Sequence, residues 1–333
     1  MGTNLRDKNI LFISPSFFGY ETEIKNKLQE LGANVFFIDD RPNNSGIIKA
    51  IIRTNIGRKI IKNKLKRYFL NKLTQWSKID FDYVFVNTPE SFTDIEIINI
   101  YKTQLHGVPF ILYMWDSLNN RKNTKDILHF FDKKFTFDKE DAKLLNLNFR
   151  PLFFTDKYKD SLPDYSQIDV CFIGTAHTDR YLFVKKTIED LGQNLKSYCY
   201  FYLQNPFLYV YNKVSNKEFR SVLYRDICFK SLSSTSVANT IIKSKIIIDI
   251  HHPRQTGLTM RTIEVLGAKK KLITTNKDVI NYDFFNSNNV YIVDRLNPKI
   301  DLKFLELPYM DISQEIYRKY SLQGWIEEIF FQI

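Results

Sequence analysis

Short apolar runs alternate with helical segments along the chain, and this alternation limits the folds that are open to it. The runs that are typical of buried strands lie at 9–14, 34–40, 81–88, 108–117 and 134–138. Segments with apolar residues at helical spacing separate them, at 21–32, 46–75, 91–107 and 139–147. Strand–helix–strand units of this kind form parallel sheets covered by helices. The first part of the chain therefore predicts a complete doubly wound α/β domain.

A second series begins after an irregular stretch at 151–167 that contains two prolines. Its predicted strands lie at 168–175, 197–204, 245–251, 271–276 and 289–294, with helices at 180–194, 216–226 and 259–270. A chain of 333 residues is long enough for two cores. We expect one α/β domain at 1–155, a second at 156–310 and a terminal helix at 311–333.

Charge and cysteine content limit the partners and the compartment. The formal net charge of +11 favours anionic partners such as nucleotide phosphates, nucleic acid or an acidic membrane surface. The three cysteines form no CxxC pair and no disulfide framework, which is typical of a reducing compartment. No apolar run approaches the roughly 20 residues that span a bilayer, and the N-terminus lacks the apolar core of a signal peptide. We therefore expect a cytoplasmic protein.

Small and polar residues follow several predicted strands at their carboxyl ends, where open parallel sheets bind ligands. Asp116 follows the strand at 108–117, and Gly174, Thr175 and His177 follow the first strand of the second series. A glycine here lets backbone amides approach a phosphate, and a hydroxyl completes the site. The stretch matches neither GxGxxG nor a P-loop, so a plain tight turn is the favoured interpretation of this stretch taken alone.

A denser polar cluster lies between the strand at 245–251 and the helix that follows it. Gly257 precedes that helix, Thr259 can cap it, and Arg261 and Thr262 lie in its first turn. Free amides and a guanidinium at a helix N-terminus suit a phosphate. Glu264 shares a helix face with Arg261 and could accept hydrogen bonds from a ribose. The alternative is a capped helix with an Arg–Glu pair on a solvated face.

Two histidines end the same strand. His251 and His252 alternate across it, so one is expected to face the ligand edge and the other the core. A zinc site would need further ligands at suitable spacing, and the sequence offers neither HxxxH nor a cysteine partner. We therefore keep His251 as a candidate ligand contact and expect no metal and no cofactor.

The segment LTMRTIEVLGAKKKLITTN (258–276) resembles a motif of glycosyltransferases with the GT-B fold, closest to bacterial capsule, lipopolysaccharide and spore-protein-like members. The matching residues are Arg261, Glu264, Leu266, Gly267, Lys269, Leu272, Ile273 and Thr274. FIGT (172–175), YMWDS (113–117) and FTFDKEDAK (135–143) are also similar. The resemblance covers most of the chain in architecture and about a quarter of it in motif.

The resemblance implies two Rossmann-like domains that face a cleft, with a C-terminal helix crossing back to the first. It implies that the second domain binds a nucleotide-sugar, with Glu264 at the ribose and Arg261 at the diphosphate. The first domain would bind a saccharide or lipid-linked acceptor in the synthesis of a bacterial surface polysaccharide such as O-antigen or capsule. Cationic side chains and helix dipoles would assist the leaving group, without a metal.

One departure from the family concerns stereochemistry. Many retaining members carry two glutamates eight positions apart, and Thr256 stands eight positions before Glu264. We therefore expect an inverting enzyme, which needs a general base for the acceptor hydroxyl. Asp116 is the first candidate, and a structural role in capping the next helix is an equal alternative. His177 and Asp39 are weaker candidates. Asp39 lies in a sequence that is typical of a turn.

Residues 47–73 contain nine cations and no acid, interleaved with isoleucines and leucines. This pattern suits a helix resting on an anionic membrane surface, where a lipid-linked acceptor would be presented. We expect peripheral contact with the inner face of the cytoplasmic membrane. The alternative is a helix that covers the sheet with its apolar side and exposes a solvated basic side.

Other function classes remain as alternatives. A sugar-nucleotide epimerase of the same fold would need no acceptor and would leave the basic stretch unexplained. A nucleic-acid-binding protein would fit the charge, but we find no zinc-finger, RNA-recognition or helix-turn-helix pattern and expect no nucleic acid. A periplasmic binding protein would require the signal peptide that we do not find.

Overall fold

The chain forms two α/β units in a computed structural model that describes residues 4–43, 52, 55–159, 167–176, 179–192, 194–252 and 256–331, without the side chains of 55 and 56. Residues 1–151 and 322–333 form the first unit, and residues 152–321 form the second. Each unit contains one six-stranded sheet in which all neighbouring strands run parallel. The predicted fold class, two doubly wound α/β domains, is confirmed.

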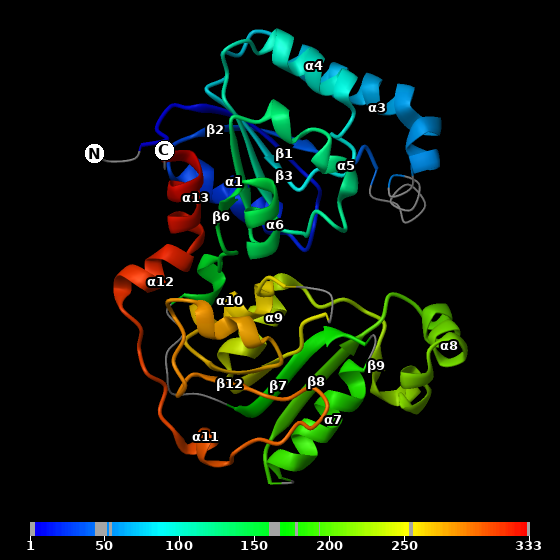
Figure 1. The fold of residues 1–333 in the computed structure, drawn as a ribbon, viewed down its shortest axis with the longest axis vertical. Coiled ribbons are helices and arrows are strands. Elements are labelled where there is room, and N and C mark those ends of the chain that lie inside the picture. The colour runs from blue at the N-terminus through cyan, green and yellow to red at the C-terminus, as the bar shows by residue number, and fades with distance from the viewer. Residues whose placement is uncertain are drawn as a thin grey trace. The chain divides into compact units, whose positions relative to one another are not determined.

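The first sheet has the strand order β2-β1-β3-β4-β5-β6. Its strands are β1 (Asn9–Ser14), β2 (Asn34–Asp39), β3 (Tyr83–Asn87), β4 (Phe110–Met114), β5 (Lys133–Thr136) and β6 (Asn148–Phe149). The helices of this unit are α1 (Tyr20–Glu30), α3 (Asn55–Gln75), α4 (Ile95–Gln104), α5 (Lys122–Lys125), α6 (Lys139–Leu145) and α13 (Leu322–Phe331). Figure 1 shows α3 and α4 together on one side of the sheet and α1 and α13 on the other.

Both faces of the first sheet are buried, which explains its continuous apolar strands. Alternate residues of β1 point to opposite faces. Leu11 packs into the core under α3 and α4, whereas the ring of Phe12 stacks on Phe85. Phe85 in turn contacts Trp325 of α13 at a ring-centroid distance of 5.9 Å. The terminal helix therefore completes the core of the first unit.

The second sheet has the strand order β12-β11-β10-β7-β8-β9. Its strands are β7 (Ile168–Thr175), β8 (Ser197–Tyr202), β9 (Ile227–Cys228), β10 (Ser244–Asp249), β11 (Lys271–Thr274) and β12 (Val290–Ile292). The helices are α7 (Arg180–Leu191), α8 (Pro206–Ser215), α9 (Ser234–Ile242), α10 (Met260–Gly267), α11 (Lys303–Glu306) and α12 (Gln314–Tyr320). Short 3-10 turns include η2 (Asp156–Tyr158), η3 (Lys217–Ser221) and η4 (Tyr224–Asp226). Figure 1 shows α9 and α10 on one side of this sheet and α7 and α11 on the other.

Some predicted elements differ from the structure. The helix predicted at 216–226 is wrong: α8 covers Pro206–Ser215, and only the turns η3 and η4 follow it. The side chain of Asn205 caps α8 and Pro206 occupies its first turn, so the helix begins ten residues earlier than predicted. Two helices, α12 and α13, occupy 311–333 in place of one, and the boundary between the units lies between them.

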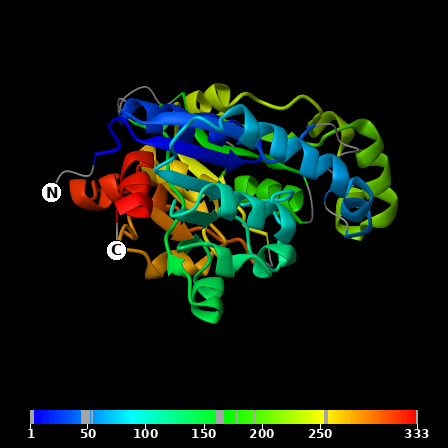
Figure 2. The ribbon, with the colours of Figure 1, turned by 90° about the horizontal axis from the view of Figure 1, so that it is seen from above.

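The basic stretch lies only partly within the described residues: 47–51 and the side chains of 53–56 lie outside them. Over the described part, Leu65, Phe69 and Leu73 of α3 are buried in the core. Lys62 and Lys66 form ion pairs with Asp94 and Glu96, which lie at the start of α4. Figure 2 shows α3, in light blue, along the sheet of its unit. Packing in the first unit therefore accounts for the apolar side of α3 and for part of its charge.

Gly267, in the last turn of α10, has a packing role. A Cβ atom added there would lie 2.4 Å from Cγ and 2.7 Å from Cβ of Phe154. Those atoms lie next to the backbone of Phe154 and have little freedom to move. We expect Gly267→Ala to lower the free energy of unfolding of the second unit by roughly 1–3 kcal/mol, the usual cost of overpacking. Urea denaturation measures the change.

Gly174→Ala is the matched control for that substitution. The added Cβ would lie 2.8 Å from Cζ of Phe172, at the far end of a side chain that can rotate away. We expect a smaller loss of stability than for Gly267→Ala. Equal losses in the two variants would contradict the assigned role of Phe154.

Candidate functional site

The carboxyl edge of the second sheet gathers the ends of β7, β10, β11 and β12, because these four neighbouring strands run parallel. The predicted candidates Gly174, Thr175 and His251 lie at this edge, and α10 begins beside it. His177 lies outside the described residues. A ligand site in this unit is therefore expected at this edge.

The start of α10 is held on the end of β10. Thr259 caps the helix, as predicted, and its hydroxyl accepts the backbone N–H of Thr262 at 3.2 Å. The hydroxyls of both threonines also donate to the carboxylate of Asp249, which is 6% exposed. Asp249 therefore fixes the direction of the helix N-terminus, whose positive end favours anions.

Arg261 and Glu264 form an ion pair on the next part of α10. Nη1 of Arg261 lies 2.7 Å from Oε2 of Glu264, and the Glu264 side chain is only 5% exposed. Tyr158 of η2 lies beside the pair; burial, followed by the charge of Glu264, raises the pKa of its phenol. The prediction of a shared helix face is confirmed, and the alternative of a solvated pair is wrong. The Arg261 side chain retains 18% exposure.

Arg180 and Arg295, which the sequence analysis missed, lie at the same edge. Arg295 binds both carboxylate oxygens of Asp179, at 2.7 and 2.6 Å, and donates to the backbone carbonyl of His251 at 2.8 Å. Arg180 donates to the hydroxyl of Thr175 at 3.1 Å. Its Nε is buried and has no hydrogen-bond partner among the described residues. Burial lowers the pKa of Arg180, and the nearby carboxylate of Asp249 opposes that change.

His251 lies within this cationic group. Its Nδ1 is 2.8 Å from the hydroxyl of Thr275. Burial lowers the pKa of His251, and the positive charge of Arg295 lowers it further. The neutral imidazole is therefore favoured, which suits a hydrogen-bonding role better than a charged one.

The two candidate glycines have structural explanations. Gly174 leaves room for the ring of Phe172, two residues earlier on the same strand face. Gly257 is buried, and its carbonyl accepts a 3.4 Å hydrogen bond from Asn276. Neither contact by itself points to a phosphate.

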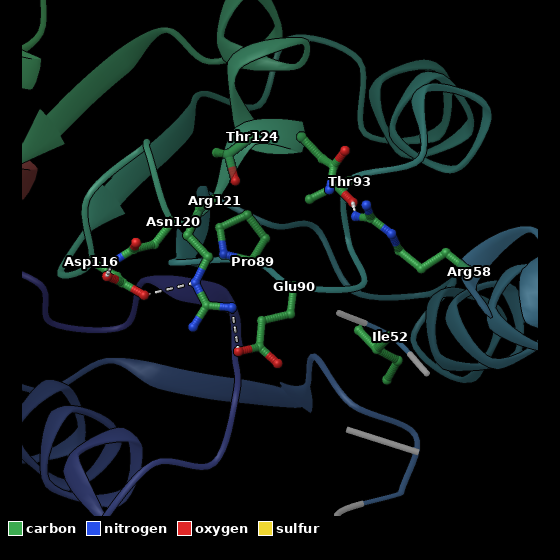
Figure 3. Close-up of a pocket in the computed structure, with 10 residues that line it drawn as sticks. Ile52, Arg58, Pro89, Glu90, Thr93, Asp116, Asn120, Arg121 and Thr124 are labelled. Atoms are coloured by element: carbon green, nitrogen blue, oxygen red, sulfur yellow. Dashed lines mark hydrogen bonds and ion pairs between the residues drawn. The ribbon is translucent and has the colours of Figure 1, made fainter. Parts of the chain in front are cut away.

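A second polar group lies at the carboxyl edge of the first sheet (Figure 3). Arg121 bridges two carboxylates, with Nε 2.9 Å from Asp116 and Nη1 2.6 Å from Glu90. Glu90 also pairs with the buried Arg41 at 2.6 Å. Asp116, Glu90 and Arg121 line a pocket of about 370 Å³. Figure 3 also shows Arg58 on the far side of this pocket, where it donates to Thr93 at 3.2 Å.

Asp116 does not cap the next helix, so that alternative is wrong. The N-cap residue of α5 is Arg121, and its side chain makes no capping hydrogen bond. Instead, Oδ1 of Asp116 accepts from Asn120 at 2.9 Å and Oδ2 accepts from Arg121. Its side chain is 30% exposed at the pocket wall. Asp39 accepts from Ser16 and from the backbone of Arg41, which is consistent with the predicted turn.

Asp40 lies beneath this pocket wall with no exposed surface. Its carboxylate accepts the backbone N–H groups of Glu90, Ser91 and Phe92 at 2.7–2.8 Å. Burial raises the pKa of Asp40 from 3.8 to about 6, although the three hydrogen bonds lower it in part. Asp40 thus ties the loop after β3 to the end of β2.

This raised pKa predicts a pH-dependent stability. Between pH values of about 4 and about 6, folded Asp40 keeps a proton that the unfolded chain has released. The contribution of Asp40 to stability therefore falls as the pH rises through this window, by about 1.4 kcal/mol for each pKa unit of difference. We expect Asp40→Asn to remove this slope from urea-denaturation profiles, whereas the exposed Asp80→Asn keeps it. Parallel profiles for wild type and Asp40→Asn would contradict the assignment.

Within the described ranges, no three or more His, Cys, Asp or Glu side chains are grouped so that they could hold a metal ion. No helix in the described part of the chain has the length and apolar character needed to span a bilayer.

The sequence matches no protein-family profile and no curated protein. Solved structures do match. HepE from Anabaena in complex with UDP-glucose has 11% identity, covers 96% of this chain and 94% of its own, and has a TM-score of 0.56. A glycosyltransferase from Rickettsia africae has 13% identity, 97% and 94% coverage and a TM-score of 0.54. Sucrose-phosphate synthase from Thermosynechococcus elongatus has 11% identity, 97% and 95% coverage and a TM-score of 0.54.

These matches run over nearly the full length of both chains, and both units take part in them. With two parallel six-stranded sheets, the chain therefore has the GT-B fold, as its sequence predicts.

Proposed function

We propose that the chain is a glycosyltransferase that transfers a sugar from a nucleotide-sugar to a saccharide or lipid-linked acceptor. The observation that carries this proposal is the cationic edge of the second sheet. There, the buried Nε of Arg180 has no partner among the described residues, and the capped start of α10 lies nearby. Buried polar groups without a partner are rare and call for a ligand or water. A diphosphate would satisfy both groups.

In this proposal the second unit binds the donor. Arg180 and Arg261 contact the diphosphate, and Glu264 binds the ribose. Glu264 already accepts a hydrogen bond from Arg261. Ribose binding therefore requires its carboxylate to accept hydrogen bonds from both Arg261 and the ribose hydroxyls. The remaining described candidates, namely Gly174, Thr175, His251, Gly257, Thr259 and Thr262, surround the donor or hold the α10 N-terminus, and His177 stays a candidate outside the described residues. HepE was solved with UDP-glucose, so a UDP-sugar is the first donor to test.

The first unit binds the acceptor and supplies the base. Asp116 takes the proton from the acceptor hydroxyl, whose oxygen then forms a bond to the anomeric carbon. The bond from that carbon to the diphosphate oxygen breaks, and the nucleoside diphosphate leaves with the electron pair. The arginines stabilise the charge on the departing diphosphate. The reaction is inverting and requires no metal in this scheme.

The test is acceptor-dependent release of nucleoside diphosphate. Each of several nucleotide-sugars is incubated with the chain and with a surface polysaccharide fragment, and the released diphosphate is measured. We expect nucleoside diphosphate to be released only when both the nucleotide-sugar and the acceptor are present, and the anomeric configuration of the sugar to invert. An epimerised nucleotide-sugar without release would instead favour the epimerase.

We also propose that the acceptor belongs to a bacterial surface polysaccharide such as O-antigen or capsule, and that the chain works at the inner face of the cytoplasmic membrane. The exposed cations Lys59, Lys64 and Arg67 on α3 suit an anionic membrane surface. Reversing these three charges to Glu should weaken binding to vesicles that contain phosphatidylglycerol. The matched control reverses three exposed cations elsewhere, Lys186, Lys277 and Lys303. Equal vesicle binding by both variants would contradict the proposed contact between α3 and the membrane.

A further inference from the structure

The helix α8 carries a row of apolar side chains on its outward face. Phe207, Val210, Tyr211 and Val214 are 86%, 60%, 67% and 75% exposed. Their spacing of three, four and seven residues places them on one face of the helix. We call these four residues the α8 patch. Scattered exposed apolar residues are ordinary, but a contiguous row marks an interaction site.

The opposite face of α8 is already packed. Tyr209 is 9% exposed, lies in the core of the second unit and donates to the carbonyl of Val222 at 2.8 Å. Asn205 caps the helix by accepting the backbone N–H of Leu208 at 2.8 Å. The helix is therefore held without help from the α8 patch. On a helix that covers a soluble core, the outward face would be polar.

Figure 1 shows α8 beyond β9, which is the edge strand of the second sheet. Two further apolar side chains, Leu223 and Tyr224, are 45% and 57% exposed in the segment that follows. The ring of Tyr224 contacts that of Tyr209 at a centroid distance of 5.2 Å. Tyr224 therefore packs against the inward side of α8, opposite the α8 patch.

Cations outnumber acids in the segment that contains α8 and the turns after it. Residues 205–231 contain five cations, Lys213, Lys217, Arg220, Arg225 and Lys230, and two acids, Glu218 and Asp226. Asp226 is bound by Tyr181 and Lys185 of α7, so Glu218 is the acid left to oppose the five cations. Among the cations, Lys217 and Arg220 lie in η3, which packs against α8.

We propose that α8 docks on an anionic lipid surface, with the α8 patch inserted among the lipid tails at the headgroup boundary and the surrounding cations on the lipid phosphates. A helix with an apolar face and flanking Lys and Arg is the form that interfacial helices take. The excess of positive charge favours a membrane over a protein partner or a second copy, because neither of those requires cations around the apolar face. The proposal refines the membrane contact proposed above and rests on it for its setting, but it concerns a different unit and a different helix.

The test measures co-sedimentation with phosphatidylcholine vesicles that contain or lack phosphatidylglycerol. We expect the full chain to bind the anionic vesicles, and Phe207→Ser with Val214→Ser to weaken that binding by about tenfold or more, since each large apolar side chain contributes strongly when buried. Lys217→Gln with Arg220→Gln removes two positive charges and should weaken the binding by about fivefold for each. Leu144→Ser with Leu296→Ser is the control, because these side chains are 78% and 92% exposed on other helices or loops.

Three outcomes would overturn the inference: no vesicle binding by the wild type, equal loss in the control, or no loss in the patch variant. A concentration-dependent dimer that Phe207→Ser abolishes would show that a second copy covers the patch instead. The patch variants should keep the thermal shift that a nucleoside diphosphate produces in the wild type. If the chain binds vesicles but no nucleoside diphosphate raises its Tm, the docking of α8 is supported and the proposed function is contradicted.

Discussion

Replacing Arg261 by alanine is expected to lower the affinity of the chain for a nucleoside diphosphate by roughly a hundredfold, because each hydrogen bond to a charged group is worth about 1.5–3 kcal/mol. Arg261 lies in the first turn of α10, and its guanidinium has five N–H donors. Glu264 engages Nη1, and 18% of the side chain remains exposed for a ligand. Isothermal titration with the diphosphate that binds the wild type measures the loss.

The same substitution removes the partner of a buried carboxylate. A buried ion pair broken on one side costs about 3–5 kcal/mol of stability, so a loss of binding could reflect a weakened fold. The double variant Arg261→Met with Glu264→Gln, compared with Glu264→Gln alone, separates the two effects, since both lack the buried carboxylate and only the double variant lacks Arg261. We expect the double variant to recover stability in urea but not nucleotide affinity. Wild-type affinity in either variant that lacks Arg261 would exclude Arg261 from the donor site.

Asp116→Asn is expected to lower the rate of sugar transfer by about 10²–10⁴-fold, the usual contribution of a general base. Asp116 lies in the first unit, and the proposed donor site lies in the second, so the affinity for nucleoside diphosphate should not change. The loss should therefore fall on kcat. Initial rates of nucleoside diphosphate release, at saturating donor and acceptor, measure it.

A structural role for Asp116 would produce a different pattern. Its carboxylate holds Arg121 and Asn120, so the substitution could disturb the pocket wall and raise KM for the acceptor. Glu90→Gln is the matched variant, because it also weakens the hold on Arg121 but leaves Asp116 in place. Loss of kcat in Asp116→Asn alone supports the base. Equal effects in both variants, with an unchanged pH profile, would reduce Asp116 to a positioning residue.

The fold could be predicted because both sheets are parallel and covered on both faces. Their strands are therefore continuous apolar runs, such as the three isoleucines of β10, Ile246–Ile248. The edge strands β6 and β9 were missed because each has two residues and no such run. The start of α8 could have been found, because Asn205 and Pro206 form an ordinary helix-start signal.

The candidate site could be predicted only where its residues are neighbours in the sequence. The cap at Thr259 and the shared face of Arg261 and Glu264 follow from helix geometry. Arg295 reaches Asp179 across 116 positions of the chain, a pairing that depends on the strand order of the second sheet. The burial of Glu264 could not be predicted from the neighbouring sequence, because tertiary packing beside Tyr158 covers it.

A thermal-shift panel of UDP, GDP and CMP tests whether the second unit binds a nucleotide-sugar through its diphosphate. A ligand at a hundred times its Kd stabilises a fold by about 2.7 kcal/mol, which corresponds to a rise in Tm of roughly 5 °C or more for a domain of this size. We predict such a rise with UDP or GDP and a much smaller one in Arg261→Ala. No rise with any of the three nucleotides, or a rise with CMP alone, would contradict binding through a diphosphate.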